Sequence, residues 1–151
     1  MKKNSFLEKI KVKINTDVVL EKLQSEYGEE VSKLLDFNEF NIGEKLQMNS
    51  FHQENFRLLY IAEKQKLCRL QDNFDERAGQ KYDKYKYGNS KDLSKVEIER
   101  YYLPKDEELI KLKKIIRLQE TRVEFFSAVA DSFKSQGFNM RVFMDNLKVG
   151  G

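Results

Sequence analysis

Glycine, proline and cysteine are scarce in this sequence: its 151 residues include seven glycines, one proline and one cysteine. A β-sandwich or β-barrel needs a turn signal about every ten residues, and so few glycines and prolines cannot supply them. The composition therefore predicts an all-α protein of one domain, with or without an extended helical arm. The lone Cys68 cannot form a disulfide within the chain, which fits a reducing cytoplasm.

Long apolar runs are absent as well. Residues 4–14 mix lysine and glutamate with single apolar residues, so they lack the continuous apolar region of a signal peptide. No stretch reaches the roughly 20 apolar residues that a helix needs to span a bilayer. We therefore expect a cytoplasmic protein without a membrane partner.

The residue patterns that carry catalysis or hold a metal are also missing. His52 is the only histidine, which excludes a histidine-rich metal site. The sequence contains no Cys-x-x-Cys, Gly-x-Ser-x-Gly or Walker-type motif. Cys68 adjoins the apolar Leu67, and we interpret it as a packed side chain rather than a nucleophile. We expect no enzymatic activity, no cofactor and no metal.

The formal net charge of +3 combines segments of opposite sign. Residues 1–14 carry five basic and one acidic residue, whereas residues 15–76 carry seven basic and thirteen acidic residues. Residues 77–105 carry eight basic and four acidic residues, and residues 106–151 carry eight and seven. Two basic segments thus flank an acidic one, and the second basic segment contains five of the seven tyrosines.

The first fifty residues are expected to form short elements. Apolar side chains alternate with lysines over residues 10–14, and this period leaves a half-buried strand and an extended arm as open alternatives. A short amphipathic helix is expected to begin at Thr16 or Asp17 and to end at Gly28. Short helical pieces and turns are expected over residues 29–49.

A long helix is expected to begin near Ser50, because Ser50 and Gln53 have the spacing of a capping box. Farther along, six residues spaced alternately by four and three keep one stripe facing a partner helix. These residues are Phe56, Tyr60, Glu63, Leu67, Leu70 and Phe74. The stripe fades beyond Arg77.

A turn is expected within residues 88–104, which contain Gly88 and Pro104. Ser94 and Glu97 have capping-box spacing, so they predict one short helix inside this stretch. The chain therefore changes direction before its second long helix.

The second long helix is expected to begin at the acidic residues 106–108, because negative charge suits the N-terminal end of the helix dipole. It is expected to end at about Gln136, with Gly137 in the left-handed conformation. Phe138 would then contact Phe133, which is the hydrophobic contact of a Schellman cap. A short final helix is expected after the glycine.

This second long helix carries a stripe with heptad spacing over almost four heptads. Flanking apolar residues make the face wider than one partner helix can cover. Packing within a monomeric bundle is one explanation, but we favour a homo-oligomer larger than a dimer, a helical bundle or ring in which the polar residue sets the register. We assign oligomerisation to Leu109, Leu112, Ile116, Gln119, Val123, Phe126, Ala130 and Phe133.

A run rich in lysine and tyrosine precedes the expected turn. Lysines attract phosphates by releasing counterions, and tyrosine rings offer faces on which unstacked bases can lie, so their interleaving favours single-stranded over duplex DNA. The alternative is a solvated helix end whose tyrosines pack on a neighbour. We predict that residues 1–88 form a DNA-binding region and residues 89–151 an oligomerisation region. The predicted nucleic-acid contacts are Arg77, Lys81, Tyr82, Lys84, Tyr85, Lys86, Tyr87 and Arg100.

Several of these features, in this order, resemble the UvsY recombination mediator family of large tailed phages, over roughly the C-terminal half of the chain. They are the run from Lys81 to Gly88, the segment Glu99-Arg100-Tyr101-Tyr102, the long helix from residue 105 to 136, and its ending Phe133-Lys134-Ser135-Gln136-Gly137-Phe138. The sequence departs from the family where adjacent tyrosines are split as Tyr85-Lys86-Tyr87, and where scattered lysines replace a Lys-x-Arg pair.

The resemblance implies a non-enzymatic, ring-shaped oligomer that binds single-stranded DNA in recombination and DNA repair. It also implies two protein partners. One is a phage recombinase, UvsX-like, which the protein loads onto the strand, and the other is the phage single-stranded DNA-binding protein, which it helps to displace. The implied location is the cytoplasm of an infected host cell.

A different class of function also fits the sequence. A helical adaptor or assembly chaperone would bind only protein, and its lysines would serve solubility. Salt-dependent binding to oligo(dT) separates this alternative from a DNA-binding mediator, because only the latter releases counterions from a strand.

Overall fold

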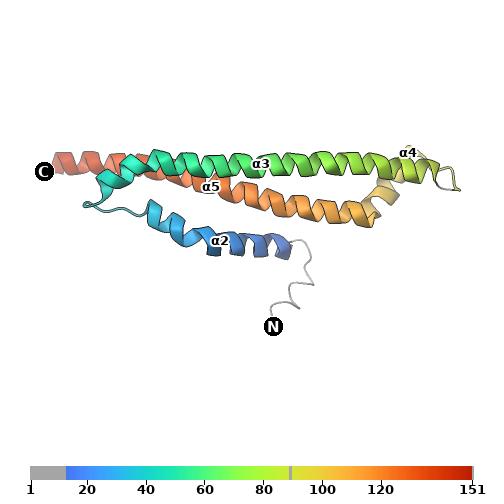
Figure 1. The fold of residues 1–151 in the computed structure, drawn as a ribbon, viewed down its shortest axis with the longest axis horizontal. Helices are drawn as coiled ribbons and strands as arrows, with labels where there is room; N and C mark the ends of the chain where they lie inside the picture. Colours follow the sequence, from blue (N-terminus) through green and yellow to red (C-terminus); the bar gives the residue numbers. More distant parts are fainter. Residues whose placement is uncertain (1–12, 89, 151) are drawn as a thin grey trace, which may run out of the picture. The chain divides into compact units, whose positions relative to one another are not determined.

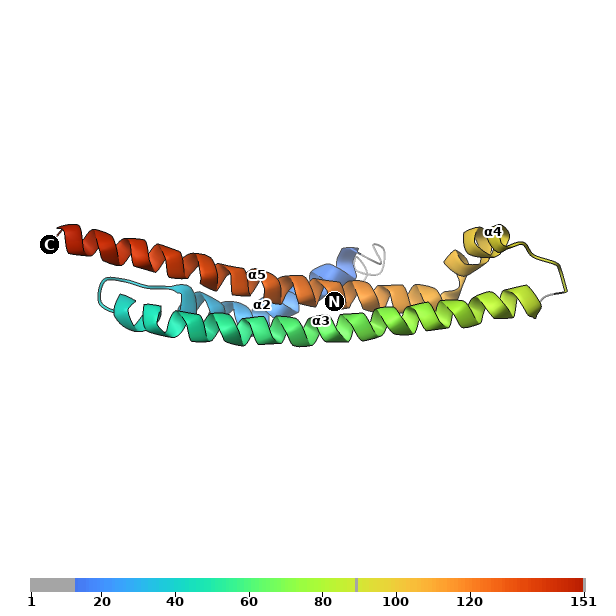
Figure 2. The same cartoon turned by 90° about the horizontal axis from the view of Figure 1, so that it is seen from above.

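The computed structural model describes residues 13–88 and 90–150, and no strand occurs among them. The prediction of an all-α fold is therefore confirmed for this part of the chain. Figures 1 and 2 show two long helices joined by a connection of short helical turns, with a shorter helix before them. The elements are α2 (Lys13–Leu35), α3 (Ile42–Tyr87), α4 (Lys95–Glu97), a π-helix η1 (Ile98–Tyr102), a 3-10 turn η2 (Leu103–Lys105) and α5 (Glu107–Gly150).

The chain divides into two compact units. The first unit comprises residues 1–63 and 121–151, and the second comprises residues 64–120. Both α3 and α5 contribute to each unit. This division differs from the functional one predicted at residue 88, which concerns activity and stays a prediction.

Three helices form the core of the first unit. The ring of Phe56 stacks on that of Phe133 with the centroids 5.4 Å apart, and Tyr27 meets Phe126 edge to face at 5.3 Å. Truncation of a buried Phe to Ala costs about 3 to 5 kcal/mol, so these rings hold α2, α3 and α5 together. The buried cluster consists of Leu23, Phe56, Phe126, Val129 and Phe133.

The predicted stripe on α3 faces the interior. Phe56 and Glu63 are buried, and the other four members are half-buried. Glu63 can occupy this face because Arg122 of α5 donates to both of its carboxylate oxygens, each at 3.1 Å. A charge in the core requires such a partner, so removing Arg122 would deprive a buried carboxylate of the cation that donates to both of its oxygens.

Helix α2 continues through Gly28 to Leu35, so the predicted end at Gly28 is wrong. No described glycine has a positive φ. Val31 and Leu34 pack against the core cluster, and these contacts offset the roughly 1 kcal/mol that glycine costs inside a helix. Ile14 lies in α2, so the strand alternative is wrong at that position, whereas Ile10 and Val12 lie outside the described residues.

Helix α3 begins at Ile42, eight residues before the predicted start, so Ser50 and Gln53 lie inside it and form no N-terminal cap. The chain reverses between α2 and α3 through two asparagines. Asn38 Oδ1 accepts from the Asn41 N–H at 3.0 Å, and Asn41 Oδ1 accepts from the Asn38 N–H at 2.7 Å. This reciprocal turn satisfies backbone groups that a helix start leaves unpaired.

The connection between α3 and α5 follows the prediction. Ser94 and Glu97 form a complete capping box, with both side chain to backbone bonds present. Pro104 lies in η2, and α5 begins at Glu107 directly after the acidic Asp106.

Helix α5 does not stop at Gly137 but runs to Gly150, so the predicted Schellman cap is wrong. Gly137 is buried, and a Cβ built on it would lie 2.6 Å from Oδ1 of the buried Asn49 on α3. The glycine therefore permits close packing of two helices rather than a left-handed turn. The separate final helix predicted after Gly137 is wrong too, because the buried Met140 lies on the same continuous helix.

Two glycine substitutions in the first unit are expected to have opposite effects on its stability. Gly137→Ala should destabilise the protein by about 1 to 3 kcal/mol, because the added methyl group meets Asn49 in a packed site. Gly28→Ala should stabilise it by about 0.5 to 1 kcal/mol, because the nearest atom to a built Cβ is Gln24 Cβ, at an ordinary 4.0 Å. Urea unfolding followed by circular dichroism measures both. Stabilisation by both substitutions would contradict the close approach at Gly137.

Candidate nucleic-acid interface

The run rich in lysine and tyrosine forms the last turns of α3 in the second unit. Figure 2 shows the chain leaving α3 and turning back through α4 to the start of α5. The predicted contacts from Arg77 to Tyr87 lie on α3, and Arg100 lies on η1. The acidic start of α5 belongs to the same unit, and it determines how these side chains are arranged.

Asp106 is the centre of this arrangement, with a side chain only 6% exposed. Its Oδ1 atom accepts from the N–H groups of Glu108 and Leu109, both at 3.1 Å, and so caps the N-terminus of α5. Its Oδ2 atom accepts the hydroxyl proton of Tyr85 at 2.7 Å and lies 3.5 Å from Lys81 Nζ. One buried carboxylate thereby joins the start of α5 to the end of α3.

Glu108 makes the second connection. Arg77 donates from Nε at 2.6 Å and from Nη2 at 2.8 Å, one bond to each carboxylate oxygen. Lys81 Nζ lies 3.0 Å from Glu108 Oε2, so this lysine contacts both acids. The planar, bidentate pair of Arg77 and Glu108 fixes the relative orientation of the two side chains as well as neutralising their charges.

The network shifts the pKa values of its members. Hydrogen bonds from Arg77 and Lys81 lower the pKa of Glu108 to about 2. Burial raises the pKa of Asp106, but the bonds from Tyr85 and the Leu109 N–H, with the charge of Lys81, outweigh burial and leave it lowered. The hydrogen bond to Asp106, together with burial, raises the pKa of Tyr85 to about 12. At neutral pH both acids are therefore charged and the phenol is protonated.

Four of the eight predicted contacts are thus engaged inside the chain. Arg77, Lys81 and Tyr85 bind the two acids, and Lys86 donates to the backbone carbonyl of Leu93 at 2.7 Å. From the sequence, the acids are recognisable only as a favourable helix start. The spacing of 77, 81 and 85 by four residues, which places them along one helix face, is the signal that could have indicated a shared partner.

The other predicted contacts are more accessible. Lys84 and Arg100 are exposed, and their side chains form no hydrogen bond or ion pair within the described residues. The side chain of Tyr87 is 80% exposed, and Tyr82 is half-buried. Tyr101, which is not among the predicted contacts, is also exposed. These residues place two cations and two largely exposed aromatic rings in contact with solvent.

The stripe assigned to oligomerisation is covered only in part by the chain itself. Leu109, Phe126 and Phe133 are buried in the single chain, and the other five members are half-buried. Packing within the chain therefore covers three members of the stripe completely and the other five partly. The oligomer and the residues assigned to it stay predictions, and the five half-buried members keep part of their surface accessible to another copy.

Neither a membrane span nor a metal cluster emerges from the described part of the chain. None of its helices is long and apolar enough to cross a bilayer. Nowhere within residues 13–88 and 90–150 do three or more His, Cys, Asp or Glu side chains gather in a way that could hold a metal ion.

Acid is expected to destabilise the second unit through Glu108. Folding lowers the pKa of Glu108 from 4.5 to about 2. The charged carboxylate therefore stabilises the folded protein at pH values above 4.5, and this contribution is lost as the pH falls toward about 2. Glu108→Gln should therefore lower stability at neutral pH and flatten the acid dependence. Urea midpoints measured from neutral pH downward test this.

The matched control is Glu107→Gln, which removes the same charge from the exposed neighbouring position. That variant should keep the acid dependence of the unmodified protein. Identical pH profiles for all three proteins would mean that the contacts of Arg77 and Lys81 with Glu108 do not form in solution.

The fold is similar to that of a solved recombination mediator. The crystal structure of UvsY from bacteriophage T4 superposes with a TM-score of 0.71 at 16% sequence identity, covering 84% of this chain and 98% of that chain. No protein-family model and no curated protein sequence matches this chain. The likeness extends beyond the C-terminal half that carries the sequence resemblance, and it establishes that the chain shares the all-α fold of UvsY.

Proposed function

We propose that this chain is a non-enzymatic recombination mediator that binds single-stranded DNA through the exposed face of its second unit. The observation that carries the proposal is the presence of uncommitted cations and exposed tyrosines on the same elements, Lys84 and Tyr87 on α3 and Arg100 and Tyr101 on η1, in a chain that shares the fold of a recombination mediator. Each pair combines a phosphate attractor with a stacking surface.

The chemistry of these pairs favours single strands. A lysine or arginine near a phosphate releases condensed counterions, which gives affinity without sequence preference. An exposed tyrosine ring can stack on any base, but the bases of a duplex are already stacked on one another. Arg77 and Lys81 contribute differently in this proposal, because Glu108 and Asp106 already neutralise them; they hold the end of α3 in place.

The proposal extends to the protein partners and to the assembly of the chain. The protein would load a phage recombinase onto the bound strand and help to displace the phage single-stranded DNA-binding protein, in the cytoplasm of the infected host cell. It would act as a homo-oligomer larger than a dimer, so that several subunits engage one strand. The similarity to UvsY and the sequence features shared with its family support this part.

A second candidate is a helical adaptor that binds only protein. An open apolar groove in the first unit, lined by residues of α2 and α3, favours it. An adaptor would show no salt-dependent affinity for oligo(dT), so the DNA titration decides between the two candidates.

Replacing the lysine and replacing the tyrosine at the end of α3 are expected to change oligo(dT) binding in different ways. Lys84→Ala should weaken oligo(dT) binding and reduce the slope of log K against log salt by about 0.7 for each phosphate that is no longer neutralised. Tyr87→Ala should weaken binding by up to about 1 to 3 kcal/mol at an almost unchanged slope, and Tyr87→Phe should bind normally because it keeps the ring. Fluorescence anisotropy over a range of salt concentrations provides these values.

Arg77→Ala is the matched control, because it removes a cation of the same helix that is already paired. It should lower the melting temperature and leave the salt slope unchanged. The opposite result, a reduced slope for Arg77→Ala and an unchanged slope for Lys84→Ala, would contradict the proposal. It would mean that the ion pair of Arg77 opens on binding and that Arg77, not Lys84, contacts the phosphates.

A further inference from the structure

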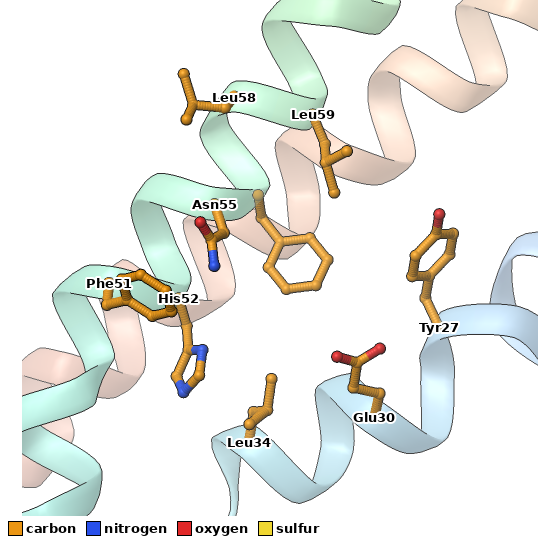
Figure 3. A pocket seen from close by; sticks show the side chains of 9 residues that line it. Tyr27, Glu30, Leu34, Phe51, His52, Asn55, Leu58 and Leu59 are labelled. Atoms are coloured by element: carbon orange, nitrogen blue, oxygen red, sulfur yellow. The ribbon is translucent and has the colours of Figure 1, made fainter.

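An open groove runs between α2 and α3 in the first unit (Figure 3). It encloses about 570 Å³, and the buried ring of Phe56 lies among its lining residues. Figure 3 shows side chains of α2 and of α3 facing one another across it. The lining residues are Tyr27, Glu30 and Leu34 of α2 and Phe51, His52, Asn55, Phe56, Leu58 and Leu59 of α3.

The α3 wall of this groove leaves large apolar side chains in water. Phe51 is 57% exposed and Leu58 is 53% exposed, and Leu59 and Met48 are also exposed. Met48, Phe51 and Leu58 follow heptad spacing together with the polar Asn55, so the four form one stripe along the helix. Three large apolar side chains on one stripe beside a groove are typical of a surface that receives an amphipathic helix.

The charge of the groove indicates which kind of partner would bind in it. Glu30 points into the groove (Figure 3) and forms no hydrogen bond or ion pair within the described residues. Helix α2 carries five acidic and three basic residues. Pairing of one groove with a second groove would bring two Glu30 carboxylates together and is disfavoured, whereas a helix that carries cations beside apolar residues is favoured.

The end of α5 has the complementary character. Phe138 is 65% exposed, Val149 is 89% exposed and Val142 is exposed, and their spacing of four and seven places them on one stripe. Along residues 133–150 the helix carries Lys134, Arg141 and Lys148 against one acid, Asp145. The three cations are spaced by seven, so they follow one side of the helix.

This stripe cannot reach the groove of its own chain. Met140 is 1% exposed, and the ring of Phe143 contacts that of Phe37 at 5.5 Å, so the opposite face of the same turns is fixed against the chain's own first unit. Because a helix is stiff, anchoring one face leaves the other directed outward. Only a separate molecule could therefore cover it.

We propose that the end of α5 in one copy, residues 134–150, docks in the α2–α3 groove of the next copy. Phe138 and Val142 would cover Phe51 and Leu58, and Arg141 or Lys148 would pair with Glu30. The contact joins two different surfaces, so repetition produces a closed ring or an open filament rather than a two-fold dimer. This inference specifies the homo-oligomer of the proposed function and rests on it, but it uses none of the DNA-binding residues.

Complementation between two defective variants tests the proposal. Leu58→Asp should disable the groove and Phe138→Asp the helix end, so each variant alone should have the mass of one chain, 18.0 kDa. A mixture should form a 1:1 pair of twice that mass, because the intact end of the first variant fits the intact groove of the second. The pair cannot grow further. Light scattering after gel filtration measures these masses, and circular dichroism confirms that each variant is folded.

Val96→Asp, an exposed apolar position in the second unit, is the control and should keep the mass of the unmodified protein. A mixture of folded variants that stays at the mass of one chain would overturn the proposal. So would an unmodified protein that is a monomer, or a Phe138→Asp variant that keeps its full assembly. Oligo(dT) binding is measured separately, so loss of DNA binding with intact complementation would reject the proposed function and leave this interface standing.

Discussion

The buried carboxylate of Asp106 is the constraint on which the second unit depends. It satisfies two N–H groups at the start of α5 and at the same time accepts the hydroxyl proton of Tyr85 at the end of α3. Hydrogen bonds to charged groups each contribute about 1.5 to 3 kcal/mol, and a buried acid without them would be strongly destabilising. The ends of two long helices, separated by a connection of irregular turns, are therefore fixed together by one side chain.

This constraint separates four of the predicted cation contacts into two groups. Arg77 and Lys81 reach the acids at the start of α5, so their charge is used within the chain. Lys84 and Arg100 are exposed and stay available for a partner. A count of basic residues cannot make this distinction, because it depends on acids that lie more than twenty residues farther along the chain.

Features governed by local chemistry could be predicted from the sequence. The capping box of Ser94 and Glu97 and the acidic start of α5 need only neighbouring residues, and the interior stripe on α3 follows from helical periodicity. The exposure of Lys84 and Tyr87 could also be predicted, because both belong to a polar run at the end of a helix.

Features governed by packing between distant segments could not be predicted. Gly28 and Gly137 carry the local signal of a helix end, but the core contacts of α2 and the close approach of Asn49 to α5 outweigh it. The same limit applies to the heptad stripe on α5, since periodicity identifies an apolar face without saying whether the chain itself or another copy covers it. The ion pairs of Arg77 and Lys81 were missed because their partners lie on another helix.

Binding of single-stranded DNA through charge and stacking is the property on which the proposed function depends. The most direct test is an anisotropy titration of the unmodified protein with labelled oligo(dT), and with a duplex of equal length, over a series of salt concentrations. We expect preference for the single strand and a slope of log K against log salt that exceeds the 0.7 of one phosphate contact several-fold, because several subunits engage one strand. Affinity that does not change with salt, or equal affinity for the duplex, would contradict the proposed function.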